Sequence, residues 1–386
     1  MKTVAYAHLT YPEIASLPRD ATLVIPLGTG PYDLEDLGRK LKAETLVVLP
    51  AIPYGFPGAG PGILADIGVG RGIFRRVLLG VQRELAKQGF QSITLLDGHN
   101  VRQLLSTDAF HLMESDSPTP QAMEGAASSP TPLPGNVADR IVVVSVGHTE
   151  QHGLHLPLST DTIIVQAIAD GLEAAAADRV VCLPAWPYGV STHTRQFPGT
   201  LNLGGRVFED FFLAVVARLV QLKVEMVFFS NAHGGNHSFL VNVVKSAGEQ
   251  WPRAFVGTEY LHTTGPALDA HRSTPRGGMG HACELETSYL LHLSPELVHM
   301  DRARPETDFI STPNYYMDWI EGGRLIANPP WTDDTVTGSY GDPTPATADK
   351  GALWLRAAIA EKLELLEEMR EQHTRRKAHR AGQAAV

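Results

Sequence analysis

Two stretches of this chain repeat one another at a distance of 134 residues, and this repetition constrains the fold more than any other sequence feature. The run LPAIPYG at 49–55 recurs as LPAWPYG at 183–189. Fifty residues after the leucine that opens each run lies a histidine, His99 in the first copy and His233 in the second. Between run and histidine, each copy predicts an amphipathic helix and then an apolar strand. These elements are helices over 72–88 and 206–222 and strands over 92–96 and 225–229. Motif, spacing and element order agree, so we interpret the chain as an internal duplication.

Alternation of strands and helices in both copies favours an α/β fold with a mostly parallel sheet. Residues 141–146, 180–183 and 227–230 are apolar enough to form central strands that are buried on both faces. Each of these strands runs into a loop rich in glycine or histidine, and sites in such folds lie at the carboxyl ends of strands. A C-terminal helix is expected over 347–375, with basic residues toward its end.

One segment differs in composition from both copies. Residues 114–136 contain five prolines, four serines and no aromatic residue. Such a segment buries too little apolar area to offset the entropy of ordering it, so we predict an exposed linker at 114–137. The linker divides the chain into a smaller half at 1–113 and a larger half at 138–386.

The composition excludes several classes of protein. The formal net charge of −10 argues against non-specific binding of nucleic acid. No apolar stretch reaches the roughly 20 residues that span a bilayer, and the first residues lack the apolar run of a signal peptide. Two cysteines, Cys182 and Cys283, cannot form a disulfide framework. We therefore expect a cytoplasmic protein with no nucleic-acid or membrane partner.

Three clusters of metal-ligand residue types occur in the larger half, in positions that follow predicted strands or open a predicted helix. They are GHTEQHGLHLPLSTD at 147–161, NAHGGNH at 231–237 and HACELETS at 281–288. Carboxylates and imidazoles are ligands for Zn, Mn and Fe, and the two oxygens of a carboxylate can bridge two ions. Glu150 and His152 are two residues apart, so in an extended chain their side chains lie on the same side.

These clusters, in this order, resemble the creatininase (creatinine amidohydrolase) family. The matching signatures are G-x-x-E-Q-H-G-x-H-L-P with an aspartate eleven residues after the glutamate, then N-G-H-G-G-N, then H-A-x-x-x-E-T-S. The segment 338–351 is also similar to the family's C-terminal G-x-x-G-D-P and A-T-A-x-K-G. The resemblance covers residues 138 to 360. It implies a creatininase-like α/β/α layered domain, which here follows a smaller, degenerate copy of the same fold.

The resemblance implies a two-metal amidohydrolase that works through a metal-activated hydroxide. Carried over to this sequence, Glu150 and His233 hold one ion, His152 and Glu286 hold the other, and Asp161 bridges the two. The expected cofactors are two divalent ions, Zn at one position and Zn, Mn or Fe at the other. Two ions roughly 4 Å apart activate water at neutral pH and polarise the carbonyl that it attacks.

Further residues are expected near the ions. The resemblance gives His281 the role of proton shuttle to the leaving nitrogen. Glu284 is an alternative ligand to Glu286, although two residues earlier on a helix it would point elsewhere. Cys283 is expected to be a packing residue. The residues that either orient the ligands or are ordinary loop residues are His148, His155, His193, His237, Asn231 and Asn236.

The sequence departs from the family pattern at three positions, which argues against creatinine as the substrate. Creatininases proper carry Tyr-Glu in place of Gly234 and Gly235, and that glutamate is a ligand there; they also carry a substrate-flanking tryptophan in place of Gly277. The Gly-Gly form resembles relatives with other substrates.

We expect hydrolysis of a C–N bond in a small cyclic amide, formamide or related small molecule. The alternatives are a peptidase that matures a small peptide-derived precursor and a non-catalytic binding or assembly subunit; the resemblance leaves a homo-oligomer open.

The smaller half lacks the ligand set. Aligning Gly28 with Gly147 places Pro31 where the larger half has Glu150. Only 21 residues separate Gly28 from Leu49, against 36 between the corresponding positions of the larger half. We therefore expect the Asp161 loop and the helix after it to be missing here. With His99 alone retained, residues 1–113 are predicted to be a non-catalytic scaffold or a wall of the substrate pocket.

Overall fold

The computed structural model of the 386-residue chain describes residues 1–28, 32–55, 67–90, 93–97, 111–114, 133, 137, 139–259, 265–320 and 322–383. Apart from Glu114, Leu133 and Val137, the predicted linker lies outside the described residues, and so does His99.

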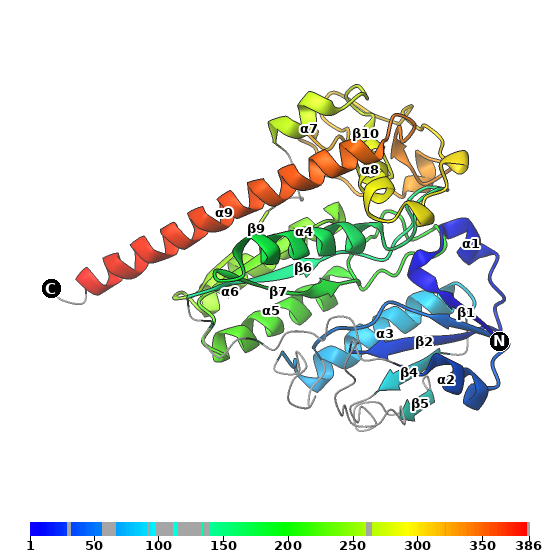
Figure 1. The fold of residues 1–386 in the computed structure, drawn as a ribbon, viewed down its shortest axis with the longest axis horizontal. Helices are drawn as coiled ribbons and strands as arrows, with labels where there is room; N and C mark the ends of the chain where they lie inside the picture. Colours follow the sequence, from blue (N-terminus) through cyan, green and yellow to red (C-terminus); the bar gives the residue numbers. More distant parts are fainter. Residues whose placement is uncertain are drawn as a thin grey trace.

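The first half of the chain forms a five-stranded parallel sheet in the order β1-β3-β2-β4-β5 (Figure 1). Its strands are β1 (Lys2–Ala5), β2 (Thr22–Leu27), β3 (Thr45–Val48), β4 (Ile93–Asp97) and β5 (His111–Glu114). Its helices are α1 (Tyr11–Ala15), α2 (Leu34–Leu41) and α3 (Arg71–Lys87). Strand side chains alternate in direction, so Leu23 and Ile25 join the core on the α3 side while Val24 packs with Leu37 of α2.

The second half forms a four-stranded parallel sheet in the order β7-β6-β8-β9. Its strands are β6 (Ile141–Val146), β7 (Val180–Trp186), β8 (Met226–Asn231) and β9 (Phe255–Thr258). Its helices are α4 (Thr160–Ala176), α5 (Gly205–Gln221), α6 (His237–Gln250), α7 (Pro266–His271), α8 (Glu284–Leu293) and α9 (Ala348–Gln383). Strands β10 (Met279–His281) and β11 (Tyr340–Gly341) form a separate antiparallel pair.

Helices cover both faces of the second sheet, which gives the α/β/α arrangement that the family resemblance implies. In β6, Val142 and Val144 join the core that contains α5, whereas Ile141 and Val143 join the core that contains α4, α8 and α9. The last part of α9 extends beyond the sheets (Figure 1). None of the described helices is long and apolar enough to cross a lipid bilayer.

Apart from the additional β1 of the first half, the two halves have the same strand order, and one pair of their helices matches closely. The order β3-β2-β4-β5 in the first sheet parallels β7-β6-β8-β9 in the second. Helices α3 and α5 have the same length, and their bounds are offset by the same 134 residues as the sequence repeat. Arg76 of α3 and Asp210 of α5, at equivalent positions of the repeat, form an ion pair at 2.8 Å. These features support our interpretation of the chain as a duplication.

One expectation for the first half is wrong. The short spacing between Gly28 and Leu49 predicts that the helix after the first strand is missing. Instead α2 occupies that place in the topology with eight residues, against seventeen in α4. The side chain of Asp33 caps α2 by accepting a hydrogen bond from the Asp36 amide at 2.8 Å. The short connection therefore shortens the helix without removing it.

A single hydrophobic cluster joins the two sheets through α3 and α5. The rings of Tyr54 and Trp186 lie 5.4 Å apart between centres, and the Tyr188 hydroxyl donates a hydrogen bond to the Pro50 carbonyl at 2.6 Å. A side chain on Gly80 would contact Leu203 at 3.2 Å, so α3 lies close against the second half. The halves are thus packed together as one body.

Candidate metal centre

The candidate site lies at the carboxyl ends of the three neighbouring strands β6, β7 and β8. The chain leaves β6 at Gly147, where an added Cβ would lie 2.6 Å from Thr162 of α4, so the close approach of helix and strand requires glycine. Glu150 and His152 follow in the loop, and Asp161 opens α4. His233 follows β8, while His281 and Glu286 come from β10 and α8. All six side chains are buried.

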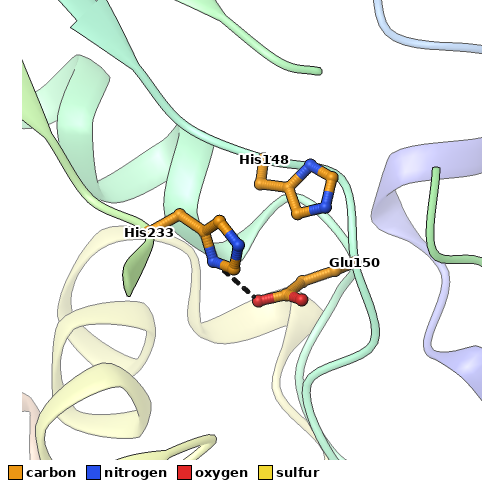
Figure 2. A group of neighbouring side chains, drawn as sticks. All are labelled: His148, Glu150 and His233. Atoms are coloured by element: carbon orange, nitrogen blue, oxygen red, sulfur yellow. Dashed lines mark ion pairs between the residues drawn. The ribbon is translucent and has the colours of Figure 1, made fainter. Parts of the chain in front are cut away.

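The two oxygens of Asp161 face two different groups of side chains. Its Oδ1 lies 3.1 Å from Nε2 of His152, and its Oδ2 lies 3.3 Å from Nδ1 of His233. On the His233 side, Oε1 of Glu150 lies 2.9 Å from the same Nδ1, and Figure 2 marks this ion pair with a dashed line. On the His152 side, Oε1 of Glu286 lies 3.8 Å from Nε2. Asp161 therefore lies between two groups of side chains, each of which could bind a metal ion.

Backbone carbonyls fix which ring nitrogen faces the centre of the cluster. His152 donates from Nδ1 to the Glu150 carbonyl at 3.1 Å, and His233 donates from Nε2 to the Val190 carbonyl at 3.0 Å. Because a carbonyl only accepts, the proton sits on these outer nitrogens. The inner nitrogens are then available as metal ligands, in the way that hydrogen-bonded histidines ligate metals.

The electrostatics of the cluster fit a cation. Burial opposes ionisation of Glu150, but the charges of His233 and His281 outweigh it and hold the pKa of that carboxyl well below its usual range. Asp161 is buried too, and His152 and His233 likewise lower its pKa. Conversely, these carboxylates outweigh burial to raise the pKa of His233 to about 10. A divalent ion bound at the inner nitrogen of His233 would replace the additional proton that this raised pKa favours.

Of the carboxylate oxygens in this cluster, two are buried without a hydrogen-bond partner among the described residues. They are Oε1 of Glu150 and Oδ2 of Asp161, the oxygens that face His233. Buried carboxylate oxygens are costly without a donor or a cation. Three groups of side chains, each with its ligand atoms within 4.8 Å of one another, could hold an ion. They are His148, Glu150 and His233; Glu150, His152 and His281; and His152, Asp161 and Glu286.

The two glutamates that open α8 have different surroundings. Glu286 faces the cluster, and its other oxygen accepts a hydrogen bond from the Ala282 amide at 2.5 Å. Glu284 points away from the cluster and accepts hydrogen bonds from the amides of Ser273 and Thr274. Lys350 also forms an ion pair with Glu284. Of the two carboxylates, only that of Glu286 is placed to meet an ion.

His281 lies between the cluster and the open side of the site. Its Nε2 donates to the Gln151 carbonyl at 2.8 Å, which turns Nδ1 toward Oε1 of Glu150, 3.8 Å away. Its ring lies 4.2 Å from that of His152 between centres. Burial and the neighbouring charge of His152 lower the pKa of His281. The ring is therefore placed either to transfer a proton beside the ions or to ligate one of them.

Three of the other sequence candidates hold the ligand loops in place. Asn231 donates to the His233 carbonyl and accepts from the His233 amide. Asn236 links two strand ends, since it donates to the Gly147 carbonyl at 3.1 Å and accepts from the Val190 amide at 2.9 Å. His148 accepts a hydrogen bond from the Gly189 amide at 2.8 Å, and its other nitrogen lies toward Glu150 (Figure 2).

The remaining three candidate histidines differ in their distance from the cluster. The rings of His193 and His233 are stacked at 6.1 Å between centres. His155 is tied by a 2.9 Å hydrogen bond between its Nε2 and the hydroxyl of Thr287. His237 is only half-buried and its Nδ1 pairs with the Glu259 carbonyl at 3.2 Å, so the structure does not bring it into the cluster.

Several residues of the site are missing from the sequence prediction. The hydroxyl of Thr194 donates to Oε2 of Glu150 at 2.9 Å, and the ring of Trp331 lies 4.4 Å from His193 and 5.0 Å from His281 between centres. Gln151 could have been found, because it lies within the E-Q-H-G run. No local pattern marks Thr194 or Trp331, which come together with the cluster only through the fold.

Gly235 stands where creatininases proper carry the glutamate of the Tyr-Glu pair, and the structure gives a steric reason for glycine at this position. A Cβ on Gly235 would lie 2.2 Å from the Val190 carbonyl and 2.5 Å from Nε2 of His233. These are the two atoms of the hydrogen bond that orients the His233 ring. With this placement of His233, residue 235 has no room for a side chain.

A cavity of about 1070 Å³ opens on the cluster. His193, His233, His281 and Glu286 are among the residues that line it. Much of the rest of its wall comes from the segment 307–331 and from β11. A cavity lined by this cluster of histidines and carboxylates suits a hydrolase whose substrate enters through the cavity.

The comparisons with known proteins agree with this fold and site. The family model of the creatininases, described as creatinine amidohydrolase, matches residues 134–366. The chain therefore belongs to the creatininase family of amidohydrolases.

Individual relatives differ in the substrates that their names state. A mycofactocin precursor peptide peptidase from Mycobacterium ulcerans is 31% identical over 222 residues, which cover 54% of this chain and 78% of that protein. A 3-dehydro-scyllo-inosose hydrolase from Thermotoga maritima is 27% identical over 196 residues, 49% of this chain and 61% of that protein. A solved structure described as creatininase with Mn has a TM-score of 0.50 and 21% identity, covering 61% of this chain and 91% of that one. That likeness shows the fold.

Proposed function

We propose that this protein is a dinuclear metal-dependent hydrolase that cleaves a C–N bond. The observation that carries the proposal is the position of Asp161, whose two oxygens face His233 at 3.3 Å and His152 at 3.1 Å. A carboxylate in this position suits a ligand shared by two ions. Apart from their contacts with Nδ1 of His233, Oε1 of Glu150 and Oδ2 of Asp161 have no partner, which adds a need for positive charge.

The residues divide into two ligand sets around Asp161. Glu150 and His233 would hold one ion, and His152 and Glu286 would hold the other. The structurally similar creatininase named above is described with Mn, which supports a divalent transition metal here, Zn, Mn or Fe by the chemistry of the ligands. When bound, two such ions supply an activated water and polarise a carbonyl.

His281 has the position of a proton shuttle. It lines the cavity, and its Nε2 is occupied by the Gln151 carbonyl, so only Nδ1 is available toward the cluster. Burial and the charge of His152 lower its pKa, and Nδ1 is the nitrogen that could take up a proton during the reaction. It would pass that proton to the leaving nitrogen.

A second candidate concerns the kind of C–N bond. A small cyclic amide or formamide would fill only part of a 1070 Å³ cavity, because pockets for drug-sized ligands span about 300–1000 Å³. The relative from Mycobacterium ulcerans is named as a peptidase that acts on a precursor peptide. Both points favour a peptidase-type reaction on a larger, peptide-derived molecule over hydrolysis of a small cyclic amide.

The test combines metal analysis with a substrate panel. The chelator-treated protein is reconstituted with Zn²⁺ or Mn²⁺, metal per chain is measured by plasma mass spectrometry, and formamides, cyclic amides and short peptides are offered. We expect about two equivalents of metal per chain and turnover that depends on the metal. A single equivalent with full activity would contradict the dinuclear proposal. Turnover of cyclic amides but not of peptides would contradict the peptidase candidate.

A further inference from the structure

The large apolar side chains that are exposed to solvent are concentrated around the cavity. Of the six such side chains among the described residues, four lie between residues 310 and 336. Ile310 is 70% exposed, Leu325 is 57% exposed and Ile326 is 91% exposed, and these three, the apolar rim, line the cavity. The fourth, Val336, is not among the described residues that line it. Exposed apolar side chains gathered at one opening indicate a binding surface, whereas scattered ones need no explanation.

Four aromatic rings, the aromatic row, connect this rim to the metal centre. Phe309, which precedes Ile310, stacks on Tyr340 with 3.6 Å between the ring centres. Trp331 lies 4.7 Å from Tyr340 and 5.0 Å from His281 between ring centres. All four rings line the cavity. A ligand that extends from the metals to the rim can therefore contact aromatic surface between its two ends.

The aromatic row is held in place by packing and by a hydrogen bond within the protein. Phe197, Trp331 and Tyr340 form a buried apolar cluster, and Phe309 packs against it. The Tyr340 hydroxyl donates a hydrogen bond to Oδ2 of Asp334 at 2.6 Å. Because these rings are ordered before a ligand binds, binding costs little of their conformational entropy.

The carboxylates of the described cavity wall are engaged within the protein. Arg272 donates to both oxygens of Asp318 at 2.9 Å, and the Gly277 amide donates to Asp318 at 2.8 Å. The other lining carboxylate, Glu286, faces the metal cluster. Neither carboxylate is therefore placed to bind a cationic group of the substrate.

We propose that the substrate is an amide with an extended apolar group, which lies along the aromatic row and reaches the rim while the C–N bond lies at the metals. This inference rests on the proposed function, since it places the reacting bond at the dinuclear centre. The apolar group belongs to a peptide with large apolar side chains or to a fatty acyl chain, because both bury the same kind of surface. Compact polar amides such as creatinine fall outside this class.

The test uses hydroxamates, which bind a metal ion at one end and carry a variable group at the other. The first series consists of straight-chain hydroxamates from acetohydroxamate to octanohydroxamate. The second compares the hydroxamate of diglycine with that of dileucine. Binding to the Zn²⁺-loaded full-length protein is measured by calorimetry, so the readout does not depend on turnover.

Affinity should rise with the apolar surface of the probe. Each added methylene should tighten binding by about 2- to 4-fold, and the dileucine probe should bind about 10- to 100-fold more tightly than the diglycine probe. A gain of dileucine over diglycine assigns the apolar group to a peptide. A gain in the straight-chain series alone assigns it to an acyl chain.

Variants of the rim test where the apolar group lies. Leu325→Ser combined with Ile326→Ser should lower the gain of octanohydroxamate over acetohydroxamate by about 3- to 10-fold, because the chain loses apolar contact area at the rim. Both side chains are exposed, so their replacement does not disturb the core. The matched control is Val336→Ser, which removes an 87% exposed apolar side chain of the same segment outside the cavity lining and should behave as wild type.

The ways of failing are distinguishable. Equal affinity for all chain lengths and for both dipeptide probes would overturn the apolar substrate class and leave the metal centre standing. A chain-length gain that is unchanged in the double variant would also overturn the inference, and so would a wild-type dimer, seen by light scattering, that the double variant dissociates, since the rim would then be a contact between two copies. If no hydroxamate binds to the metal-loaded protein, the dinuclear centre itself is overturned, and the inference with it.

Discussion

Asp161 is the residue on which the two-ion proposal depends most. Replacing it with asparagine removes the charge that two ions would share, so we expect metal content to fall at both positions and activity to be lost. Metal per chain and turnover are measured on the same preparation. Asp170→Asn, on the exposed side of the same helix, is the control and should retain both ions. Retention of two ions by Asp161→Asn would contradict the bridging role.

We expect His281 to transfer a proton during the reaction and not to be a metal ligand. Its Nδ1 lies 3.8 Å from Glu150, and its other nitrogen is held by a backbone carbonyl. His281→Gln should keep both ions and lower kcat by about 10²- to 10⁴-fold, the usual contribution of a general acid or base. The limb of the pH–rate profile that this group sets should disappear in the variant. Loss of an ion instead would make His281 a ligand.

The candidate ligands, whose roles the family resemblance implies, could be located in the sequence because they sit in short runs that follow strands or open a helix. Glu150, His152 and Asp161 fall within fifteen consecutive residues, and the fold needs only to close one loop to bring them together. Thr194 and Trp331 reach the same site from distant parts of the chain and carry no motif. Their contacts depend on how loops cross above the sheet, which no local periodicity records.

At the scale of elements, the loops that hold the ligands are fastened to the first half of the chain. Gln88, at the end of α3, accepts a hydrogen bond from the Gly199 amide at 2.8 Å and donates to the Thr200 carbonyl at 3.3 Å. The Thr200 hydroxyl in turn accepts from the Gln151 amide at 3.2 Å. The Ala7 carbonyl, also in the first half, accepts from the amide of Ser159, two residues before Asp161.

We therefore expect Gln88→Ala to loosen the metal centre although it touches no ligand. Loss of two or three partly buried hydrogen bonds should lower the free energy of unfolding by about 1–3 kcal/mol. Metal affinity should fall as well, because the Glu150–Asp161 loop loses part of its support. Denaturant titrations and Zn²⁺ competition with a chelator measure the two effects. Arg75→Ala, on the exposed face of α3, is the control; equal behaviour of both variants would contradict the idea.

The ion pair between Glu284 of α8 and Lys350 of α9 makes a pH-dependent contribution to the stability of the protein. Burial opposes ionisation of Glu284, but Lys350 and the amides of Ser273 and Thr274 outweigh it and lower the pKa of this carboxyl. A folded-state pKa below the unfolded value stabilises the protein above the unfolded pKa of about 4.3. That contribution is lost as the pH falls through the folded-state value.

Glu284→Gln should accordingly be less stable than wild type by about 1–3 kcal/mol at pH 7, since the ion pair and charged hydrogen bonds weaken. The difference should stay constant between pH 7 and pH 5 and narrow below about pH 4. Thermal melts of both proteins across this range measure it. The exposed Glu296→Gln serves as control, and a difference independent of pH down to pH 3 would contradict the assignment.

The positions of most helices and strands follow from local pattern. The apolar run at 141–146 is β6 without any shift, and the predicted helices over 72–88 and 206–222 differ from α3 and α5 by one residue. Helix α2 is not predicted from the sequence, because the short connection from Gly28 to Leu49 limits the length of a helix without excluding one. The predicted C-terminal helix ended at 375, whereas α9 continues to Gln383, since its last turns are polar and show no apolar periodicity.

At the scale of the whole molecule, the family model and the packing divide the chain differently. The model matches 134–366, which suggests that the second half is a complete unit. The hydrophobic core, however, passes from one sheet to the other through α3 and α5. Residues 1–113 cover apolar side chains that the second half cannot cover by itself.

Removal of residues 1–137 should therefore leave a fragment that associates with itself. Phe211 of α5 packs so closely on the first half that a Cβ on Gly55 would lie 2.6 Å from its ring. Trp186 packs on Tyr54 in the same region. Without the first half this apolar face meets water, and a large exposed apolar patch drives association. Because Arg76 and Asp210 occupy equivalent positions of the repeat, α5 of a second copy is the nearest substitute for α3.

Light scattering coupled to gel filtration should show dimers or larger species for the fragment. Adding Phe211→Glu to the fragment should shift it toward monomer, because a charge in the exposed patch opposes association. The same substitution in the full-length chain should instead destabilise the protein by about 3 kcal/mol or more, since it buries a charge within the core. A fragment that is monomeric and melts at the same temperature as the full-length protein would show that the first half is dispensable for the fold.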